Sequence, residues 1–442
     1  MRTTILAFLA LVLTPLLADS AAAHPVLMIS IDGLRSRDVT EAAVRGLVLP
    51  TFRKLMADGA WADGVKDMLP SVTYPNHTTL VTGVAPALHG IAGNLTFDPL
   101  QKNMEGWYWY ASDVKVPTLF DAVHDAGKVS MNSGWPVTVG NRSITDNIPE
   151  YWRAYTAEDA KLLRALSTPG LPERIEKLSG IKFEQIAGLD EAADAARAKF
   201  AAATIAADHP LFSAIHLSSL DETQHDHGPG TAEAKANLEA LDAIVGELIA
   251  AARKAEPDLV VALVSDHGFA PISKDVNLVS AFADAGLVTV KNGKVTGWQA
   301  MPWYAAGSDM IVLANPADAT VKDKVRALLA RLMADPANGI RAFIDRAGIA
   351  ARGGATDADF MVDFAPGYKG GKALTGPLIT HSDNKGTHGY FPQWSEMRST
   401  FVIAGAGVAH KPLGEIDMRD IAPTLAKIMD VKLPTATGKP LF

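Results

Sequence analysis

Three compact apolar runs, each ending at an acidic residue, are the feature that most constrains the fold. The first, "VLMISI", is followed by Asp32, and the second lies in "LFSAIHLSSLD", which ends at Asp221. The third, "DLVVALVS", is followed by Asp266 and His267. Short, nearly continuous apolar runs are typical of strands buried on both faces of a parallel sheet. A fourth run, at 399–407, lacks the acid.

Helical patterns separate these predicted strands. One follows the first run at 41–59, another follows the second at 231–255, and the last lies at 418–430. Strand–helix alternation indicates a doubly wound, mostly parallel α/β sheet. Because ligands of such sheets gather at the carboxyl ends of the strands, acidic residues at three of these ends predict a functional site.

We predict one catalytic domain over residues 24–442, since no repeat or low-complexity tract divides the chain. Two stretches interrupt the strand–helix rhythm, near 140–205 and near 277–385. The first carries aromatic residues and then an alanine-rich helical pattern, and the second carries turn signals such as "KNGK" and "GYKGGKALTG". We interpret both stretches as insertions that cover the site.

The amino terminus, residues 1–23, has the pattern of a secretory signal peptide. Met1 and Arg2 give a positive start, residues 5–18 form an apolar run, and small residues follow up to Ala23. A run of 14 apolar residues interrupted by Pro15 is short for a membrane span of ~20 residues. We therefore predict cleavage near Ala23 and a periplasmic or secreted mature protein without a membrane span.

Composition limits the chemistry that the chain can perform. The 442 residues carry a formal net charge of −8, which argues against a nucleic-acid-binding surface. The chain contains no cysteine, so disulfides and thiolate metal sites are excluded, and a metal must be bound by His, Asp or Glu. The absence of cysteine also suits a bacterial periplasm.

Candidate metal ligands follow the predicted strands or lie in later loops: Asp32, Asp221, His225, Asp266, His267 and His388. A single strand-end Asp is more often a cap or turn residue, and a single "DHG" has little specificity. Zinc accepts histidine nitrogen and carboxylate oxygen, usually with about four donors per ion. Six side chains and one hydroxyl therefore suit two Zn²⁺ ions, with phosphate oxygens at the open positions.

The segments around these residues resemble, in order and spacing, those of a known enzyme family. They are "SIDGL", "PSVTYPNHTTLVTGVAPALHGIAGN", "LDETQHDHGPG", "VSDHGF" and "GTHGY". The resemblance is to the nucleotide pyrophosphatase/phosphodiesterase family of the alkaline phosphatase superfamily. It runs from about Val26 to the C-terminus, more loosely in the two insertions. It implies an alkaline phosphatase-like fold and hydrolysis of phosphodiester or pyrophosphate bonds in nucleotide-type substrates.

The threonine block is the most specific part of this resemblance. It implies that Thr73 is the nucleophile, bound to one of two zinc ions and forming a threonyl-phosphate intermediate. Thr78 and Thr79 are then structural residues in a helix that begins near Pro75. Zinc lowers the pKa of a bound hydroxyl, so no general-base histidine is required. The helix N-terminus would direct backbone N–H groups at the phosphate.

The resemblance assigns the remaining positions one by one. The zinc that activates the nucleophile has three expected ligands: Asp32, Asp266 and His267. The second zinc has three others: Asp221, His225 and His388. Asn94 is expected to hydrogen-bond a phosphate oxygen. Several histidines are not expected to bind metal, although a supporting role of the last two stays open: His77, His89, His227 and His381.

Substrate contacts are the least constrained part of the sequence. Tyr74 directly follows the nucleophile, and Tyr155 in "EYWRAY" is a second aromatic residue expected to help sandwich a base. Residues 107–110, "WYWY", could line the pocket or pack in the core. A base, choline, glycerol and other leaving groups are not distinguished.

Other chemistries of the superfamily make different demands. A sulfatase needs a Cys or Ser nucleophile with Arg four residues later, whereas this chain has Thr73 and His77, so that activity is excluded. A phosphomonoesterase or a phosphonoacetate hydrolase needs a cation for the extra negative charge. No Arg or Lys lies in the motifs near the nucleophile, which favours diesters. A non-catalytic binding protein would lack a ligand or the nucleophile, and none is missing.

Overall fold

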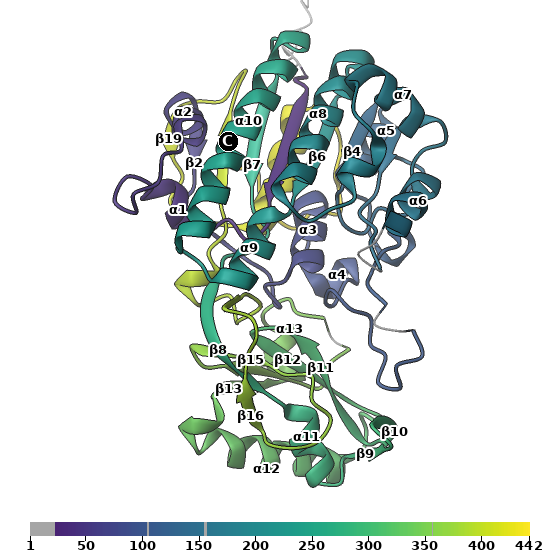
Figure 1. Ribbon diagram of the computed structural model, residues 1–442, viewed down its shortest axis with the longest axis vertical. Coiled ribbons are helices and arrows are strands. Elements are labelled where there is room, and N and C mark those ends of the chain that lie inside the picture. Colours follow the sequence, from purple (N-terminus) through teal and green to yellow (C-terminus); the bar gives the residue numbers. More distant parts are fainter. Residues whose placement is uncertain (1–22, 104–105, 154–156, 356) are drawn as a thin grey trace, which may run out of the picture.

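The computed structural model describes residues 23–103, 106–153, 157–355 and 357–442. The predicted signal peptide up to residue 22 and Tyr155 therefore lie outside the described residues. The molecule is elongated, with a larger upper part built on one sheet and a smaller lower part built on separate sheets (Figure 1). Strand β8 (Ala270–Val276) runs from the upper part into the lower one.

Eight strands of the described chain form the main sheet, in the order β19-β2-β18-β7-β1-β6-β4-β5. β1 pairs in parallel with β6 and β7, and β4 pairs in parallel with β6 and β5. β18 runs antiparallel to β7. The bounds are β1 Val26–Ile31, β2 Ala60–Trp61, β4 Ser130–Ser133, β5 Asp146–Ile148, β6 Phe212–Leu217, β7 Val260–Val264, β18 Phe401–Ala404 and β19 Lys411–Pro412. The predicted mostly parallel α/β class is confirmed.

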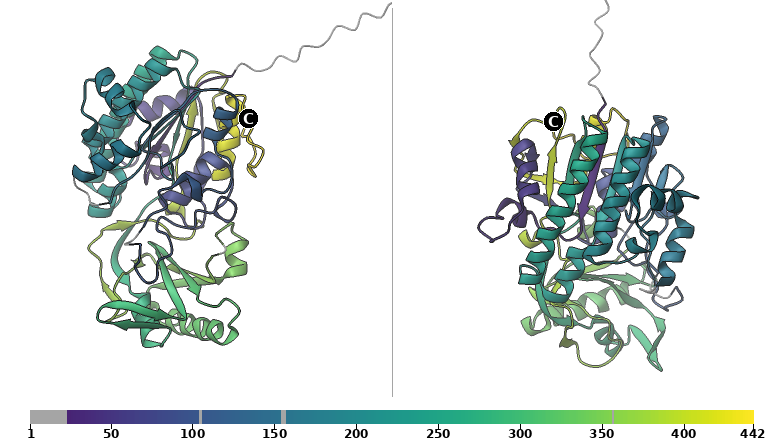
Figure 2. Two further views of the ribbon diagram at one scale, coloured as in Figure 1. Left: turned by 90° about the vertical axis from the view of Figure 1, so that its right-hand side faces the viewer. Right: turned by 45° about the horizontal axis from the view of Figure 1, so that its top comes forward.

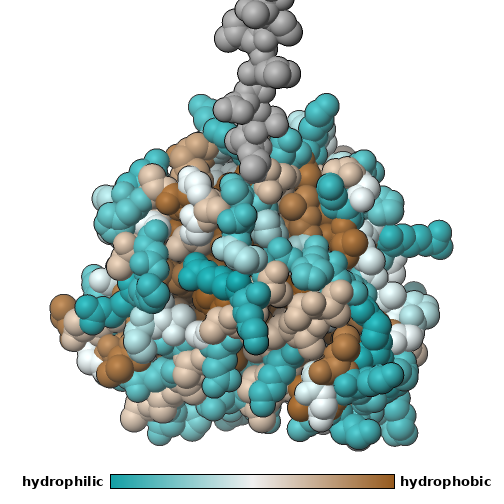
Figure 3. All heavy atoms as spheres, turned by 90° about the horizontal axis from the view of Figure 1, so that it is seen from above, coloured by the Kyte–Doolittle hydropathy of each residue, from teal (hydrophilic) through white to brown (hydrophobic). Residues whose placement is uncertain are grey.

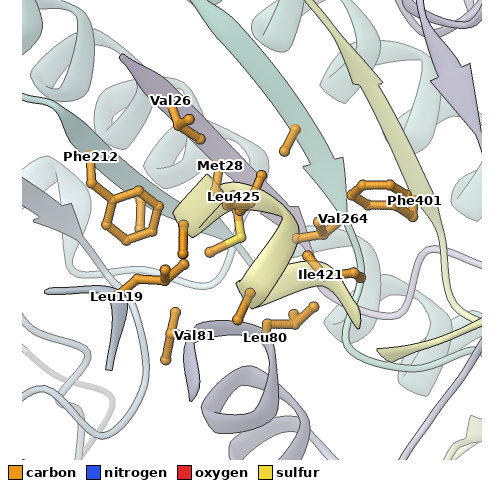
Figure 4. Close-up of a cluster of buried hydrophobic side chains, with 14 of the residues drawn as sticks. Val26, Met28, Leu80, Val81, Leu119, Phe212, Val264, Phe401, Ile421 and Leu425 are labelled. Atoms are coloured by element: carbon orange, nitrogen blue, oxygen red, sulfur yellow. The ribbon is translucent and has the colours of Figure 1, made fainter. Parts of the chain in front are cut away.

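Helices cover both faces of this sheet (Figure 2). One layer consists of α2 Pro50–Asp58, α8 Glu191–Asp208 and α10 Ala232–Ala255, and the other of α3 Thr73–Thr82, α5 Leu119–Asp125 and α14 Ile421–Ile428. Because side chains alternate along a strand, Leu27 and Ile29 of β1 face the first layer, whereas Val26 and Met28 face the second. Figure 4 shows the second core, where Leu425 packs among residues of the sheet and of α3.

Several predicted elements need correction. The helix predicted over 41–59 begins only at Pro50, a residue suited to a first helical turn. β6 ends at Leu217, so Asp221 is not at a strand end but in helix α9 (Ser219–His227). The stretch 140–205 is not simply an inserted cover, because it begins with the sheet strand β5 and ends with α8, which packs against α10 and β6. Only its middle, with α6 (Ala157–Leu166) and α7 (Leu171–Ser179), lies outside these layers.

The stretch 277–385 forms most of the lower part and has its own hydrophobic core. An antiparallel sheet in the order β11-β12-β14-β13 is joined by a second sheet in which β15 and β16 flank β8. The "KNGK" turn closes the β9–β10 hairpin, with positive φ at Asn292 and Gly293. The bounds are α11 Leu278–Asp284, β9 Val288–Lys291, β10 Lys294–Trp298, β11 Ala300–Ala305, β12 Ser308–Leu313, α12 Ala319–Met333, β13 Ile340–Asp345, α13 Arg346–Ala350, β14 Phe360–Phe364, β15 Gly367–Gly370 and β16 Ile379–His381.

Short elements complete the chain: α1 Ser36–Thr40, β3 Gly64–Lys66, α4 Pro86–His89, β17 Gly386–Thr387 and β20 Glu415–Asp417. Seen from above, the upper end of the molecule mixes hydrophilic and hydrophobic residues in small patches (Figure 3). Within the described ranges, none of the helices has the length and apolar character needed to cross a bilayer.

A buried ion pair fixes the start of α9. Asp194 of α8 is fully buried, and its carboxylate accepts hydrogen bonds from the backbone N–H groups of Ser218 (3.1 Å) and Ser219 (2.9 Å). Arg197 lies 2.6 Å from the same carboxylate. Three donors therefore converge on one buried acid, and they anchor the helix that carries two candidate metal ligands.

We expect Asp194→Ala to destabilise the fold by about 3 kcal/mol, because it leaves two backbone N–H groups without their acceptor and Arg197 without its carboxylate partner. Urea unfolding of purified protein measures this loss. The matched control is Asp58→Ala, which breaks an exposed pair with Lys54 and should cost below about 1 kcal/mol. Equal stabilities of the two variants would contradict the anchoring role of Asp194.

Candidate functional site

The candidate ligands meet at the carboxyl ends of the central strands. Asp32 follows β1, and Asp266 and His267 follow β7. Two further ligands, Asp221 and His225, lie four residues apart on α9, so they share one face of that helix. The last, His388, follows β17, and Thr73 is the first residue of α3. The structure therefore brings all seven predicted positions together at the carboxyl ends of the central strands.

The first group surrounds His267. Its Nε2 atom lies 3.0 Å from Asp266 Oδ2 and 3.3 Å from Asp32 Oδ1. The hydroxyl of Thr73 lies 3.4 Å from the same Nε2 atom. The other oxygen of Asp266 accepts a hydrogen bond from the backbone N–H of Gly33 at 3.2 Å. One imidazole nitrogen, two carboxylates and the threonine hydroxyl thus point at a common space.

The second group lies beside it. His225 Nε2 is 3.3 Å from Asp221 Oδ2, and His388 Nε2 is 3.8 Å from Asp221 Oδ1. The rings of His267 and His388 stack with centroids 3.6 Å apart, so the two groups adjoin. Among the described residues, two overlapping triads hold their ligand atoms within 4.8 Å of one another: Asp221, His225, His388 and Asp32, Asp221, His267.

The three histidines present the same nitrogen to the carboxylates. The Nδ1 atoms of His225, His267 and His388 lie 3.0, 3.0 and 3.2 Å from the backbone carbonyls of Gly386, Gly268 and Ser71. A carbonyl only accepts, so each Nδ1–H donates and Nε2 is the nitrogen that faces the carboxylates. This arrangement is the one that metal-binding histidines adopt. Burial, and then the nearby His267, also lower the pKa of His388 to about 3.

The carboxylates supply the decisive test of a metal site. Asp32 Oδ1, Asp221 Oδ1 and Asp266 Oδ2 are buried and accept no hydrogen bond from the described residues. Burial, and then the charges of Asp266 and Asp221, raise the pKa of Asp32 well above its usual value. Three carboxylate oxygens without a hydrogen bond from the described residues, beside three Nε2 atoms, fit divalent cations, because zinc accepts carboxylate oxygen and neutral imidazole nitrogen.

The nucleophile candidate has a second neighbour. Asn94 Nδ2 lies 3.4 Å from Thr73 Oγ1, and Asn94 Oδ1 accepts the backbone N–H of Tyr74 at 2.9 Å. The amide of Asn94 is thereby fixed beside the first turn of α3. Thr78 and Thr79 instead donate their hydroxyls to the carbonyls of the preceding turn, at 2.8 and 3.1 Å. Neither of these hydroxyls faces the metal groups.

A cavity of about 430 Å³ opens beside Thr73 and Asn94. Trp107, Trp109, Trp152 and Tyr304 supply its aromatic wall, so part of the "WYWY" segment does line the pocket. Two cations also line it, Arg153 from the first stretch and Lys372 from the lower part. The motifs near the nucleophile carry no Arg or Lys, but these two cations reach the pocket from other segments. The sequence motifs could not predict these cations, because Arg153 and Lys372 lie in segments without a motif.

The structure does not support the predicted contact of Tyr74 with the substrate, since the residue has no exposed surface. Its hydroxyl donates to Glu150 at 2.6 Å, and its ring packs against Trp107 and Trp109. Tyr155, the partner predicted for the sandwich, lies outside the described residues. The wall of the pocket is instead made by the neighbouring tryptophans.

The four histidines not expected to bind metal lie outside both ligand triads, although His77 Nδ1 lies 3.6 Å from Asp266 Oδ2. His227 lines a separate cavity beside α9, and His381 lies exposed on β16. His77 is buried below the site, where its ring nitrogens contact the carbonyl of Thr73 and the hydroxyl of Ser30, both at 2.9 Å. His89 is buried and contacts the hydroxyl of Thr79.

Sequence reasoning missed two residues behind the first group. His216 of β6 lies 3.0 Å from Asp32 Oδ2 through Nε2 and 2.7 Å from Glu150 Oε2 through Nδ1. A signal was present, because His216 is the one ionisable residue in an otherwise apolar or small strand, "FSAIHL". Its partner Glu150 lies in the stretch interpreted as an insertion, where no pattern marked it.

Comparison with known proteins identifies the family. The model of the family "type I phosphodiesterase/nucleotide pyrophosphatase" matches residues 26–391. The chain belongs to this family. The match spans both parts of the molecule and all of the candidate ligands, which confirms the resemblance drawn from the motifs.

Relatives of this phosphodiesterase family are about a quarter identical to the chain over the stretches that align. Member 1 of the ectonucleotide pyrophosphatase/phosphodiesterase family from Mus musculus is 26% identical over 257 residues, or 55% of this chain and 24% of the relative. An uncharacterized pyrophosphatase/phosphodiesterase from Schizosaccharomyces pombe is 25% identical over 261 residues, or 56% of this chain and 45% of the relative. The chain thus matches less than half the length of these relatives.

Solved structures share the fold. Murine and human ectonucleotide pyrophosphatase/phosphodiesterase 5 superpose with a TM-score of 0.64 at 18% identity, covering 94% of this chain and 97% of theirs. One murine structure is an inactive variant, with a threonine replaced by alanine, in complex with AMP. At this identity the likeness establishes the alkaline phosphatase-like fold.

Proposed function

We propose that this chain is a di-zinc phosphodiesterase/nucleotide pyrophosphatase that works through a threonyl-phosphate intermediate on Thr73. The observation that supports it most is the position of the Thr73 hydroxyl, 3.4 Å from both His267 Nε2 and Asn94 Nδ2. The inactive threonine-to-alanine variant of a structural neighbour is consistent with a threonine nucleophile.

Two zinc ions would be held by separate ligand sets. Asp32, Asp266 and His267 would bind the first together with Thr73, and Asp221, His225 and His388 would bind the second. Bound zinc would lower the pKa of the Thr73 hydroxyl and stabilise the leaving oxygen. The unpartnered oxygens of the three aspartates support this assignment, because each has a free acceptor position.

The protein groups around Thr73 would bind and orient the phosphate. Asn94 Nδ2 is a donor beside the nucleophile, and the first N–H groups of α3 present the positive end of the helix dipole. Thr73 Oγ attacks phosphorus, the bond from phosphorus to the leaving oxygen breaks, and the hydroxyl proton passes to solvent. Water then attacks the phosphorus of the threonyl-phosphate, and the bond to Thr73 Oγ breaks. This step releases the nucleoside monophosphate and restores the Thr73 hydroxyl.

The charged wall of the pocket bears on the substrate class. Arg153 and Lys372 add positive charge to the lining of this pocket, to which Glu222 and Asp226 contribute negative charge. The two cations favour nucleotide pyrophosphates, whose leaving group carries further phosphate charge, over diesters whose aryl group is uncharged. They also keep a phosphomonoesterase or phosphonoacetate hydrolase as the alternative, because those substrates carry an extra negative charge. A non-catalytic binding protein receives no support, since the nucleophile and all six side-chain ligands are present.

We also propose that the chain is exported and acts in the periplasm or outside the cell. The signal-peptide pattern of residues 1–23 supports this. Its mammalian relatives are ectonucleotide enzymes, which is consistent with that location.

Metal content is the first test. We expect two zinc ions per chain, because six His and Asp side chains form two adjoining groups. Elemental analysis of purified protein measures the stoichiometry. Chelation should abolish hydrolysis and added zinc should restore it, whereas a preparation with magnesium alone and full activity would contradict the assignment.

Replacement of the nucleophile is the second test. Thr73→Ala should retain both zinc ions and the fold but lose at least ~10³-fold in kcat/KM, because the covalent route is removed. The matched control is Thr78→Ala on the same helix, which should keep most activity. Loss of activity in the control and not in Thr73→Ala would show that the block has been misassigned.

Substrate comparison is the third test. We expect kcat/KM for a nucleotide pyrophosphate to exceed that for the matching monoester by ~10² or more. The phosphorus under attack in the monoester carries an extra negative charge, which is costly to bury beside Thr73. Lys372→Ala should lower the rate with the pyrophosphate by about tenfold and leave the rate with a diester of an uncharged aryl group nearly unchanged, since only the pyrophosphate carries a distal charge. Faster turnover of the monoester or of phosphonoacetate would favour the alternative activities.

A further inference from the structure

Four buried side chains from different parts of the chain form a continuous series of hydrogen bonds. The Tyr74 hydroxyl donates to Glu150 Oε1 at 2.6 Å, and Glu150 Oε2 lies 2.7 Å from His216 Nδ1. His216 Nε2 lies 3.0 Å from Asp32 Oδ2. Tyr74, His216 and Asp32 are at most 4% exposed, and the Glu150 side chain is 13% exposed. The series connects the residue after the proposed nucleophile with a proposed ligand of the first zinc.

We propose that His216 is a positioning residue that makes Asp32 a one-oxygen ligand of the first zinc and that Glu150 and Tyr74 hold it in that role. The inference rests on the proposed function, because it assigns a task within the same metal site. His216 itself contacts neither the pocket nor the second ligand group.

The two oxygens of the Asp32 carboxylate have different surroundings. Oδ2 is occupied by His216, whereas Oδ1 accepts no hydrogen bond from the described residues and lies 3.3 Å from His267 Nε2. A carboxylate with one oxygen tied cannot rotate to offer both oxygens to an ion. His216 therefore fixes which oxygen faces the metal and how the carboxylate plane is oriented.

The partners of His216 exceed what a merely buried histidine needs. A neutral imidazole is satisfied by one acceptor and one donor. Here both ring nitrogens face carboxylate oxygens, which fixes the ring from two sides. Tyr74 extends the series into α3, where its backbone N–H also binds Asn94. Ligand, nucleophile and phosphate-binding amide are thereby linked through one buried set of hydrogen bonds.

The register of the sheet explains why this set exists. β1 and β6 pair in parallel, with Ser30 opposite His216. His216, the next-to-last residue of β6, therefore lies beside the end of β1, which Asp32 follows. Glu150 reaches the same point from the loop after β5, which is the last strand of the sheet. It thereby links His216 to Tyr74.

The experiment measures zinc affinity in the full chain and does not depend on activity. Zinc is titrated against a chromophoric chelator with the wild type, His216→Ala, His216→Gln and Glu150→Gln, and unfolding curves are recorded for each. His216→Ala should weaken one of two ions by 10–100-fold and leave the other unchanged. His216→Gln should recover most of this affinity, because its amide nitrogen can replace Nε2 as the donor to Asp32.

Glu150→Gln supplies the second variant should His216→Ala fail to fold. It preserves shape and the acceptor for Tyr74, and it should weaken the same ion by several-fold. The matched control is His124→Ala, an exposed histidine on α5 that should leave both affinities unchanged. Wild-type affinity for both ions in His216→Ala and Glu150→Gln, or equal loss of both ions, would overturn the inference. A wild-type chain that binds no zinc would overturn the proposed function as well, so the two failures are distinguishable.

Discussion

The mutual repulsion of three buried carboxylates is the constraint on which the rest of the structure depends. Asp32, Asp221 and Asp266 each keep an oxygen that accepts no hydrogen bond from the described residues. Burying charge is costly, so the cluster needs positive charge or a metal ion close by. The structure supplies three imidazoles whose Nε2 atoms face these oxygens while Nδ1 donates to a backbone carbonyl. The donor geometry is thus set by the backbone before any ion binds.

The parallel sheet is what allows acids from distant segments to meet at all. β1 lies between β6 and β7, and all three strands end at the same edge. Two of the acids leave their strands directly, whereas Asp221 needs one turn of α9 to reach the same space. The orientation of α9 depends on Asp194, which binds its first backbone N–H groups. A residue far from the chemistry therefore helps to place two of the six ligands.

Local patterns account for the predictable part of the fold and site. Asp32, Asp266 and His267 follow from apolar runs, because a buried parallel strand delivers the next side chain to its carboxyl end. Thr73 and His388 needed the family motifs, since neither follows such a run. Local patterns do not report which side chains meet across the fold. His216 and Glu150 are 66 residues apart. They meet because β5, after which Glu150 follows, belongs to the same sheet as β6.

The lower part of the molecule is joined to the metal site by the chain itself. β8 leaves the upper part shortly after Asp266 and His267, and β17 pairs antiparallel with β8 just before His388. His388 is therefore held at the point where the two parts meet, and its Nδ1 binds the carbonyl of Ser71, two residues before Thr73. The lower part also carries Tyr304 and Lys372 into the pocket. A shift of the lower part would therefore move His388, a candidate metal ligand, together with two residues that line the pocket.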